Sequence, residues 1–82
     1  ELLAANQQKL RTRIEKKGRG GKTATIISGF VGPDTDLEDL ARTLKTHCGT
    51  GGSVKDGEII IQGELKDKIV TKLKALGYTQ TK

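Results

Sequence analysis

The sequence predicts an α+β protein, a two-layer α/β plait in which two helices pack on one face of a mixed sheet. Strand segments occur in two pairs, each pair joined by a glycine-containing turn. Each pair precedes a segment whose apolar residues repeat with helical spacing. The resulting order is ββαββα, followed by a short final β segment. Because both helical segments are apolar on one side only, one face of a single sheet can cover both.

The first hairpin is predicted from an alternating pattern and a β-branched run. Leu10, Thr12 and Ile14 alternate with charged residues, as in a half-buried strand. Residues 23–30 are rich in β-branched side chains, and residues 16–22 form a glycine-rich, basic turn between the two segments. The sequence therefore predicts two paired strands with basic residues at their tip.

The first helix is predicted to begin after Pro33. Thr35 and Glu38 fit a capping box, in which Thr35 caps the helix and Glu38 reaches back to it. The first turns hold acids that the helix dipole favours, namely Asp34, Asp36, Glu38 and Asp39. Gly49 provides the C-terminal stop. The apolar stripe that faces the core consists of Leu37, Leu40, Ala41, Leu44 and Cys48.

The second half of the chain repeats this plan. Asp56-Gly57 is a strong signal for a tight hairpin turn, and the isoleucines of residues 59–61 suit a central strand. Gly77 ends a second helix, whose apolar stripe consists of Leu65, Ile69, Leu73 and Leu76. Residues 78–82 are typical of the start of a last strand.

Length and composition limit the classes of protein that fit. A chain of 82 residues forms one small domain, with residues 1–10 expected to be a variable or disordered, at most weakly helical, lead-in to a domain at 11–82. Phe30 and Tyr78 are the only aromatic residues, which argues against stacking single-stranded bases on aromatic side chains. No apolar run approaches the roughly 20 residues that cross a bilayer, so we expect no membrane partner, and we expect a monomer.

The residue types that commonly carry catalysis are scarce. His47 and Cys48 are the only histidine and cysteine, and neighbours on a helix point about 100° apart, so they do not face each other as base and nucleophile. We expect Cys48 to be a small core residue and His47 to be a favourable partner of the helix dipole. One cysteine excludes an internal disulfide and a multi-cysteine zinc site. The sequence therefore predicts no catalysis, no metal and no cofactor.

The basic charge is concentrated at the start of the chain. The net charge is +5; residues 1–22 hold seven Lys and Arg residues against two acids, whereas residues 23–82 hold eight of each. A basic segment on a neutral body favours a polyanionic partner. The alternative is a solvated, solubilising hairpin tip, which is less favoured because charge this concentrated is uncommon on a merely solvated face.

The glycine-rich turn is the candidate nucleic-acid site. Its glycines let backbone N–H groups and long cationic side chains approach phosphates together, and four to six contacts would give a slope of about −3 to −5 in log K against log salt. The candidate phosphate-binding residues are Arg11, Arg13, Lys16, Lys17, Arg19 and Lys22, with Gly18, Gly20 and Gly21 as close-approach glycines. Gly51 and Gly52 form a second candidate close-approach surface, with a flexible helix-to-strand connection as the alternative.

Several strings carry a family resemblance that covers the chain from about Arg11 to Tyr78. Residues 20–23 read Gly-Gly-Lys-Thr and are followed by a strand segment and Gly29. Leu37-x-x-Leu40 and Leu44-Lys45 come next. The more specific string, residues 48–63, reads Cys-Gly-x-Gly-Gly-x-Val-Lys-Asp-Gly-x-Ile-x-Ile-Gln-Gly. With this spacing the sequence resembles the Sui-type domain of eukaryotic translation initiation factor one and its stand-alone bacterial and archaeal relatives. The tight turn after Asp56 is most similar to the stand-alone type.

The resemblance implies a non-catalytic, cytoplasmic initiation factor. Such a factor binds small-subunit rRNA near the P site and influences initiator tRNA and start-codon selection, with other initiation factors as further possible partners. The loop that inserts among rRNA phosphates corresponds to Lys16, Lys17, Arg19 and Lys22, and the loop that faces initiator tRNA corresponds to Lys55 and Asp56. The alternatives are a general RNA-binding or stress-related regulator of translation, and a protein-interaction module that uses the acidic first helix against a basic partner.

Overall fold

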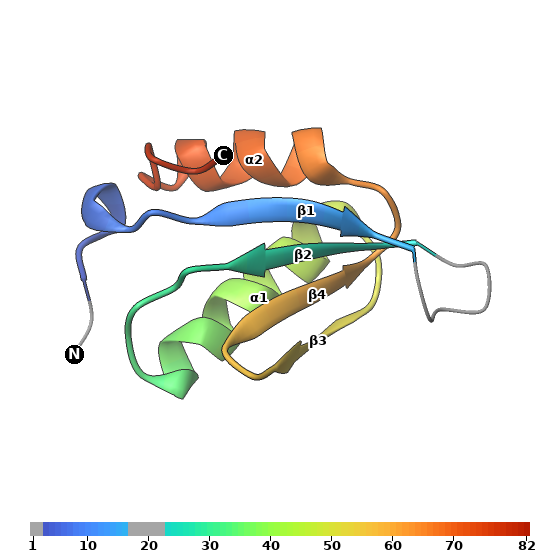
Figure 1. Cartoon of the computed structure of the whole chain (residues 1–82), viewed down its shortest axis with the longest axis horizontal. Coiled ribbons are helices and arrows are strands. Elements are labelled where there is room, and N and C mark those ends of the chain that lie inside the picture. Colours follow the sequence, from blue (N-terminus) through green and yellow to red (C-terminus); the bar gives the residue numbers. More distant parts are fainter. Residues whose placement is uncertain (1–2, 17–22) are drawn as a thin grey trace.

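The computed structural model describes residues 3–16 and 23–82, in which two helices cover one face of a four-stranded sheet (Figure 1). A short 3-10 turn, η1 (Ala5–Gln7), precedes the first strand. The strands are β1 (Arg11–Glu15), β2 (Ala24–Ser28), β3 (Gly52–Lys55) and β4 (Glu58–Gln62), and the helices are α1 (Asp34–Cys48) and α2 (Lys66–Ala75). The α+β class, the element order and the two layers are those that the sequence predicts.

The sheet has the strand order β1-β2-β4-β3, and each of its three strand pairs is antiparallel. The expected mixed sheet needs a last strand parallel to one of the others, and in the structure only one residue, Lys82, pairs in that way. Lys82 donates its backbone N–H to the carbonyl of Leu10 at 3.0 Å, and its own carbonyl accepts the N–H of Thr12 at 2.7 Å. This alternation is the pattern of a parallel pair with β1. The preceding residues, Thr79 and Gln80, form a turn instead of the predicted strand.

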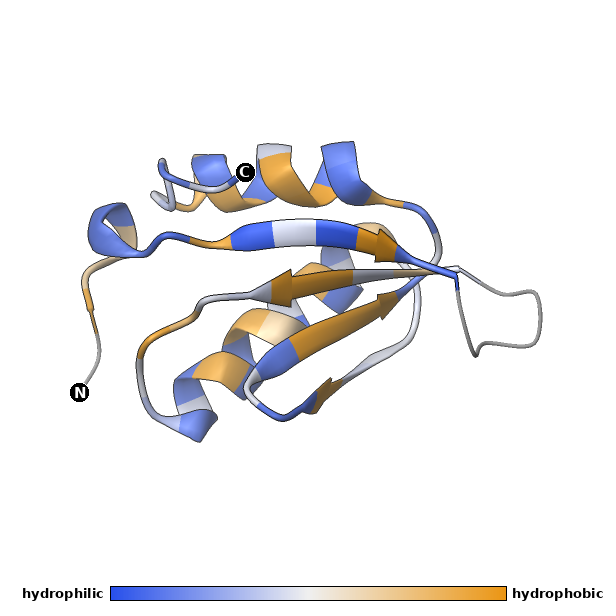
Figure 2. Ribbon diagram, in the orientation of Figure 1, coloured by the Kyte–Doolittle hydropathy of each residue, from blue (hydrophilic) through white to orange (hydrophobic). Residues whose placement is uncertain are grey.

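The core lies between the sheet and the helices, where Figure 2 shows β2 and β4 as hydrophobic strands. The sheet contributes Leu10, Ile27, Ile59 and Ile61, and the helices contribute Leu37, Leu40, Ala41, Leu44, Ile69 and Leu73. Cys48 packs against this core as predicted, and burial raises the pKa of its thiol, partly offset by the nearby charge of Lys68. Leu76 departs from the prediction, because it follows the last turn of α2 and is 40% exposed.

The lead-in is packed over the part that the structure describes, which corrects the expectation of a disordered segment for residues 3–10. Gln8 is fully buried, and its side-chain amide donates to the carbonyls of Val31 at 2.8 Å and Leu3 at 3.2 Å. Its side-chain oxygen accepts the N–H of Val31 at 2.8 Å. The expected weak helix exists as η1. Sequence periodicity missed the packing because a single buried glutamine leaves no repeating pattern.

Helix α1 begins two residues earlier than the predicted capping box requires. Pro33 is the N-cap in extended conformation, and its carbonyl accepts the N–H groups of Asp36 and Leu37 at 3.1 and 3.2 Å. Thr35 therefore lies inside the helix, and no side chain caps the N-terminus. Gly49 ends the helix in the left-handed conformation, as predicted, with φ of 66°.

Candidate nucleic-acid interface

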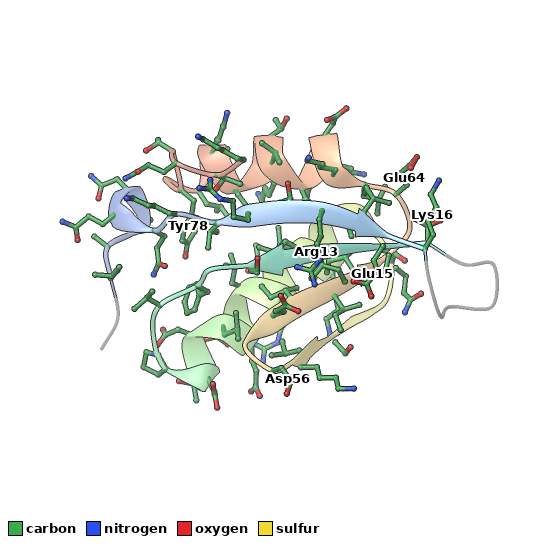
Figure 3. The ribbon with its side chains drawn as sticks, viewed as in Figure 1. Arg13, Glu15, Lys16, Asp56, Glu64 and Tyr78 are labelled. Atoms are coloured by element: carbon green, nitrogen blue, oxygen red, sulfur yellow. The ribbon has the colours of Figure 1, made fainter. Side chains whose placement is uncertain are left out.

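The basic turn joins β1 to β2 at one end of the sheet. Lys17, Arg19 and Lys22 and the close-approach glycines Gly18, Gly20 and Gly21 lie outside the described residues. Lys16 is described, is exposed, and follows the last residue of β1 (Figure 3). Figure 3 places Glu64, from the connection between β4 and α2, at the same end of the molecule. The basic turn therefore begins beside at least one acidic side chain that the charge count along the chain did not associate with it.

Arg11 and Arg13 both project from β1 onto the face of the sheet that the helices leave open, as the alternation predicts. Arg13 is held by an acid on a strand that is not its neighbour: its Nη1 donates to Glu58 Oε2 at 3.0 Å and its Nη2 to Oε1 at 3.3 Å. Nη2 also lies 3.5 Å from Glu15 Oε2. The pKa of the Arg13 guanidinium is raised, mainly by the hydrogen bond to Glu58.

The Arg13–Glu58 bridge crosses β2 and explains a residue buried on the open face. Ile26 lies directly between Arg13 and Ile60 in the register of the sheet and is only 2% exposed. Arg11, in contrast, is exposed and forms no ion pair within residues 3–16 and 23–82. Of the two arginines predicted to bind phosphate, the structure therefore leaves Arg11 available and commits Arg13 to an internal pair.

Gly51, just before β3, and Gly52, the first residue of β3, differ in what surrounds them. A Cβ atom on Gly52 would lie 2.4 Å from the backbone carbonyl oxygen of Ile60 and 3.3 Å from the Cα atom of Ile61. Gly52 is therefore required because β4 packs closely against it. The sequence analysis instead expected a ligand to approach at this position. Gly51 is exposed, and the nearest atom to its Cβ position is Gln62 Cγ at 3.9 Å. Of these two glycines, Gly51 is the one with open space beside it for the predicted close approach.

Lys55 and Asp56 lie at the β3–β4 turn, and both are exposed. Asp56 and Gly57 have φ of 53° and 75°, as a two-residue type I′ hairpin turn requires, so the predicted turn is confirmed. Because β1 and β4 run in the same direction, this turn at the start of β4 lies away from the end of β1 where the basic turn begins (Figure 3). The two loops that the resemblance assigns to rRNA and tRNA are thus separate surfaces.

The helix layer contains a hollow lined by basic residues that the sequence analysis missed. Arg42 of α1 and Lys72 of α2 line it together with Thr43, Thr46 and His47, and its volume is about 410 Å³. Arg42 is paired there with Asp39 at 3.0 Å. The overall neutrality of residues 23–82 concealed this arrangement. Its sequence signal is the asymmetry of the first helix, which begins with acids and carries its basic residues and His47 after Asp39. The described part of the chain brings no three His, Cys, Asp or Glu side chains together as a metal site.

Membrane-spanning segments are not seen in the described residues, where neither helix is long and apolar enough to cross a bilayer.

Comparison with known proteins gives consistent matches along almost the whole chain. Residues 6–79 match the family model described as Translation initiation factor SUI1. The chain is 39% identical over 80 residues to the protein translation factor SUI1 homolog of Methanocaldococcus jannaschii, covering 98% of this chain and 77% of the relative. It is 43% identical over 74 residues to the homolog of Thermococcus onnurineus, covering 90% and 74%. An uncharacterized protein of Synechocystis is 37% identical over 76 residues, covering 93% and 68%.

Proposed function

The chain belongs to the Translation initiation factor SUI1 family, and from this premise we propose that it binds the rRNA of the small ribosomal subunit near the P site through its basic hairpin turn. The family supports a role in translation initiation. The observation that carries the finer proposal is the placement of the charge: the excess of positive residues lies within residues 1–22, and the turn at 16–22 joins two paired strands at one end of the sheet.

In this proposal, phosphate contacts provide the affinity, and the shape of the folded rRNA determines the specific binding site. Lys16, Lys17, Arg19 and Lys22 contact phosphates, and Arg11 extends the contact along the open face of β1. Arg13 supports the sheet through Glu58. The Lys55–Asp56 turn is assigned to initiator tRNA, and its separation from the basic turn lets one molecule contact both RNAs. This arrangement supports an influence on start-codon selection without catalysis or a cofactor, in the cytoplasm where initiation takes place.

The test is sedimentation of the full chain with isolated small ribosomal subunits. The variant Lys17→Glu, Arg19→Glu, Lys22→Glu should lose at least about a hundredfold in affinity, and its slope of log K against log salt should fall in magnitude by about 2 to 3, because three phosphate contacts are removed. Thermal stability should stay nearly unchanged.

A matched control carries the same change in net charge elsewhere. Arg42→Glu, Lys68→Glu, Lys74→Glu alters three exposed residues of the two helices, outside the basic turn and away from Arg11, and should keep affinity within about threefold of the parent. If the turn variant sediments with the subunit as the parent does, the turn is not the rRNA contact. Equal losses in both variants, together with comparable affinity for unrelated structured RNAs, would favour a general RNA-binding regulator.

A further inference from the structure

Both aromatic residues of the chain line one hollow at the end of the molecule away from Lys16. Phe30 precedes α1 and Tyr78 follows α2, and with Leu40 and Leu76 they form the apolar wall of a groove of about 300 Å³. Figure 3 shows Tyr78 at one end and Lys16 at the other. Phe30 and Tyr78 pack against the core but are only partly buried, and Leu76 is 40% exposed. The groove therefore presents apolar and aromatic surface that the core leaves uncovered.

The rim of the same groove is acidic. Asp36 and Asp39 of α1 line it, with Thr43 one turn further on. Asp39 is bound to Arg42 at 3.0 Å, whereas Asp36 makes no ion pair with a described residue. The pKa of the Tyr78 hydroxyl is raised by burial and by the charge of Asp36, so the carboxylate and the aromatic ring act on the same space. A carboxylate beside aromatic rings suits a guanidinium, which stacks on the ring and pairs with the acid.

We propose that this groove binds a segment of another protein that carries an arginine next to an apolar side chain. The apolar side chain lies against Phe30 and Leu76, and the arginine lies over Tyr78 with Asp36 as its ion-pair partner. Partly exposed aromatic side chains are typical centres of protein–protein interfaces. RNA does not suit the site, because the carboxylates repel phosphates. The inference does not depend on the proposed rRNA contact, which uses the other end of the molecule.

The test is an NMR titration of the ¹⁵N-labelled full chain with a blocked pentapeptide of sequence Leu-Arg-Leu-Arg-Leu. Saturable shift changes are expected at Phe30, Asp36, Leu40, Leu76 and Tyr78. The variant Asp36→Asn should weaken the peptide about threefold to fivefold, as expected for a partly exposed ion pair. Leu76→Ser should weaken it by a similar factor through lost apolar contact. Both changes are at residues outside the buried core, so the variants should fold.

Asp34→Asn is the matched control, because Asp34 is an exposed acid of the same helix turn that does not line the groove. It should leave peptide affinity within twofold. The proposal is overturned if the shifts fall outside the groove, if Asp34→Asn and Asp36→Asn weaken binding equally, or if the peptide with glutamate in place of arginine binds as well. It is also overturned if the chain self-associates through these residues, or if a short RNA duplex shifts the same resonances.

Discussion

At several positions of this protein, the residue type is explained by contacts with residues that are distant in sequence. Gly52 resembles a residue that leaves room for a ligand, yet the space beside it is filled by the backbone of β4. Gln8 resembles part of a polar lead-in, yet it is fully buried. Its side-chain N–H donates to the carbonyl of Val31, and its side-chain oxygen accepts the backbone N–H of the same residue. In each case one side chain, or its absence, joins two segments that have no local pattern in common.

Gly52→Ala should destabilise the protein by about 2 kcal/mol, because the added methyl overlaps a backbone carbonyl that cannot move without disturbing the β3–β4 pair. Gly51→Ala should change the free energy of unfolding by less than about 0.5 kcal/mol, because nothing lies close to its Cβ position. Urea unfolding of both variants measures the difference. Equal destabilisation would show that the backbone conformation of the α1–β3 connection, and not the close approach of Gly52 to Ile60, makes both positions intolerant of alanine.

At the scale of the elements, the open face of the sheet is held together across strands. Arg13 of β1 reaches over β2 to Glu58 of β4, and Ile26 is buried beneath that crossing. On the other face, the helices bury the core residues of β2 and β4. Strand β2 is therefore covered on both sides, by helices on one and by an ion pair on the other. Arg11, two residues before Arg13, takes no part in this cover.

Arg11 and Arg13 should consequently respond to substitution in opposite ways. Arg13→Gln should lower the free energy of unfolding by about 0.2–1 kcal/mol, the usual range for a partly exposed pair, and should leave affinity for the small subunit within about twofold. Arg11→Gln should leave stability unchanged and reduce the salt slope of subunit binding by about 0.7–1, the loss of one phosphate contact.

Thermal unfolding and sedimentation of the two variants separate these effects. Glu58→Gln provides the check, because it should reproduce the stability loss of Arg13→Gln, and the double variant should lose little more than either single one. A stronger binding defect for Arg13→Gln than for Arg11→Gln would mean that the ion pair opens when RNA binds.

The whole molecule is polarised along its longest dimension, which measures 36 Å. The basic turn begins at one end, and the groove of Phe30 and Tyr78, with its acidic rim, lies toward the other (Figure 3). The longest dimension is roughly four times the screening length of about 8–10 Å at physiological salt. Charges at one end therefore have little direct influence on binding at the other, and the two surfaces should act independently.

Variants at one end should leave the other end intact. The double variant Asp36→Asn, Leu76→Ser should sediment with small subunits within about twofold of the parent, and the triple glutamate variant of the basic turn should bind the pentapeptide within about twofold in the NMR titration. A tenfold loss of subunit affinity in the groove variant would indicate that the groove itself contacts the ribosome. In that case the independence of the two surfaces fails.

Much of the fold follows from the order of residues along the chain. Alternation from Leu10, the helical stripes that begin at Leu37 and Leu65, and the Asp56-Gly57 turn each depend on residues a few positions apart, so propensity and periodicity are enough to place them. The concentration of positive charge within residues 1–22 is likewise a property of the sequence and needs no coordinates.

The pairings that define the surfaces arise from packing. Arg13 meets Glu58 across 45 positions because the register places β2 between their strands, and Phe30 and Tyr78 line one groove because α1 and α2 lie side by side on the sheet. Charge counted along the chain treats residues 23–82 as neutral, whereas the fold places Asp36 and Asp39 along one groove and Arg42 and Lys72 along an adjoining hollow, with Asp39 and Arg42 paired between them. Sequence periodicity reports which face of an element is apolar; three-dimensional packing decides which faces, and which charges, come together.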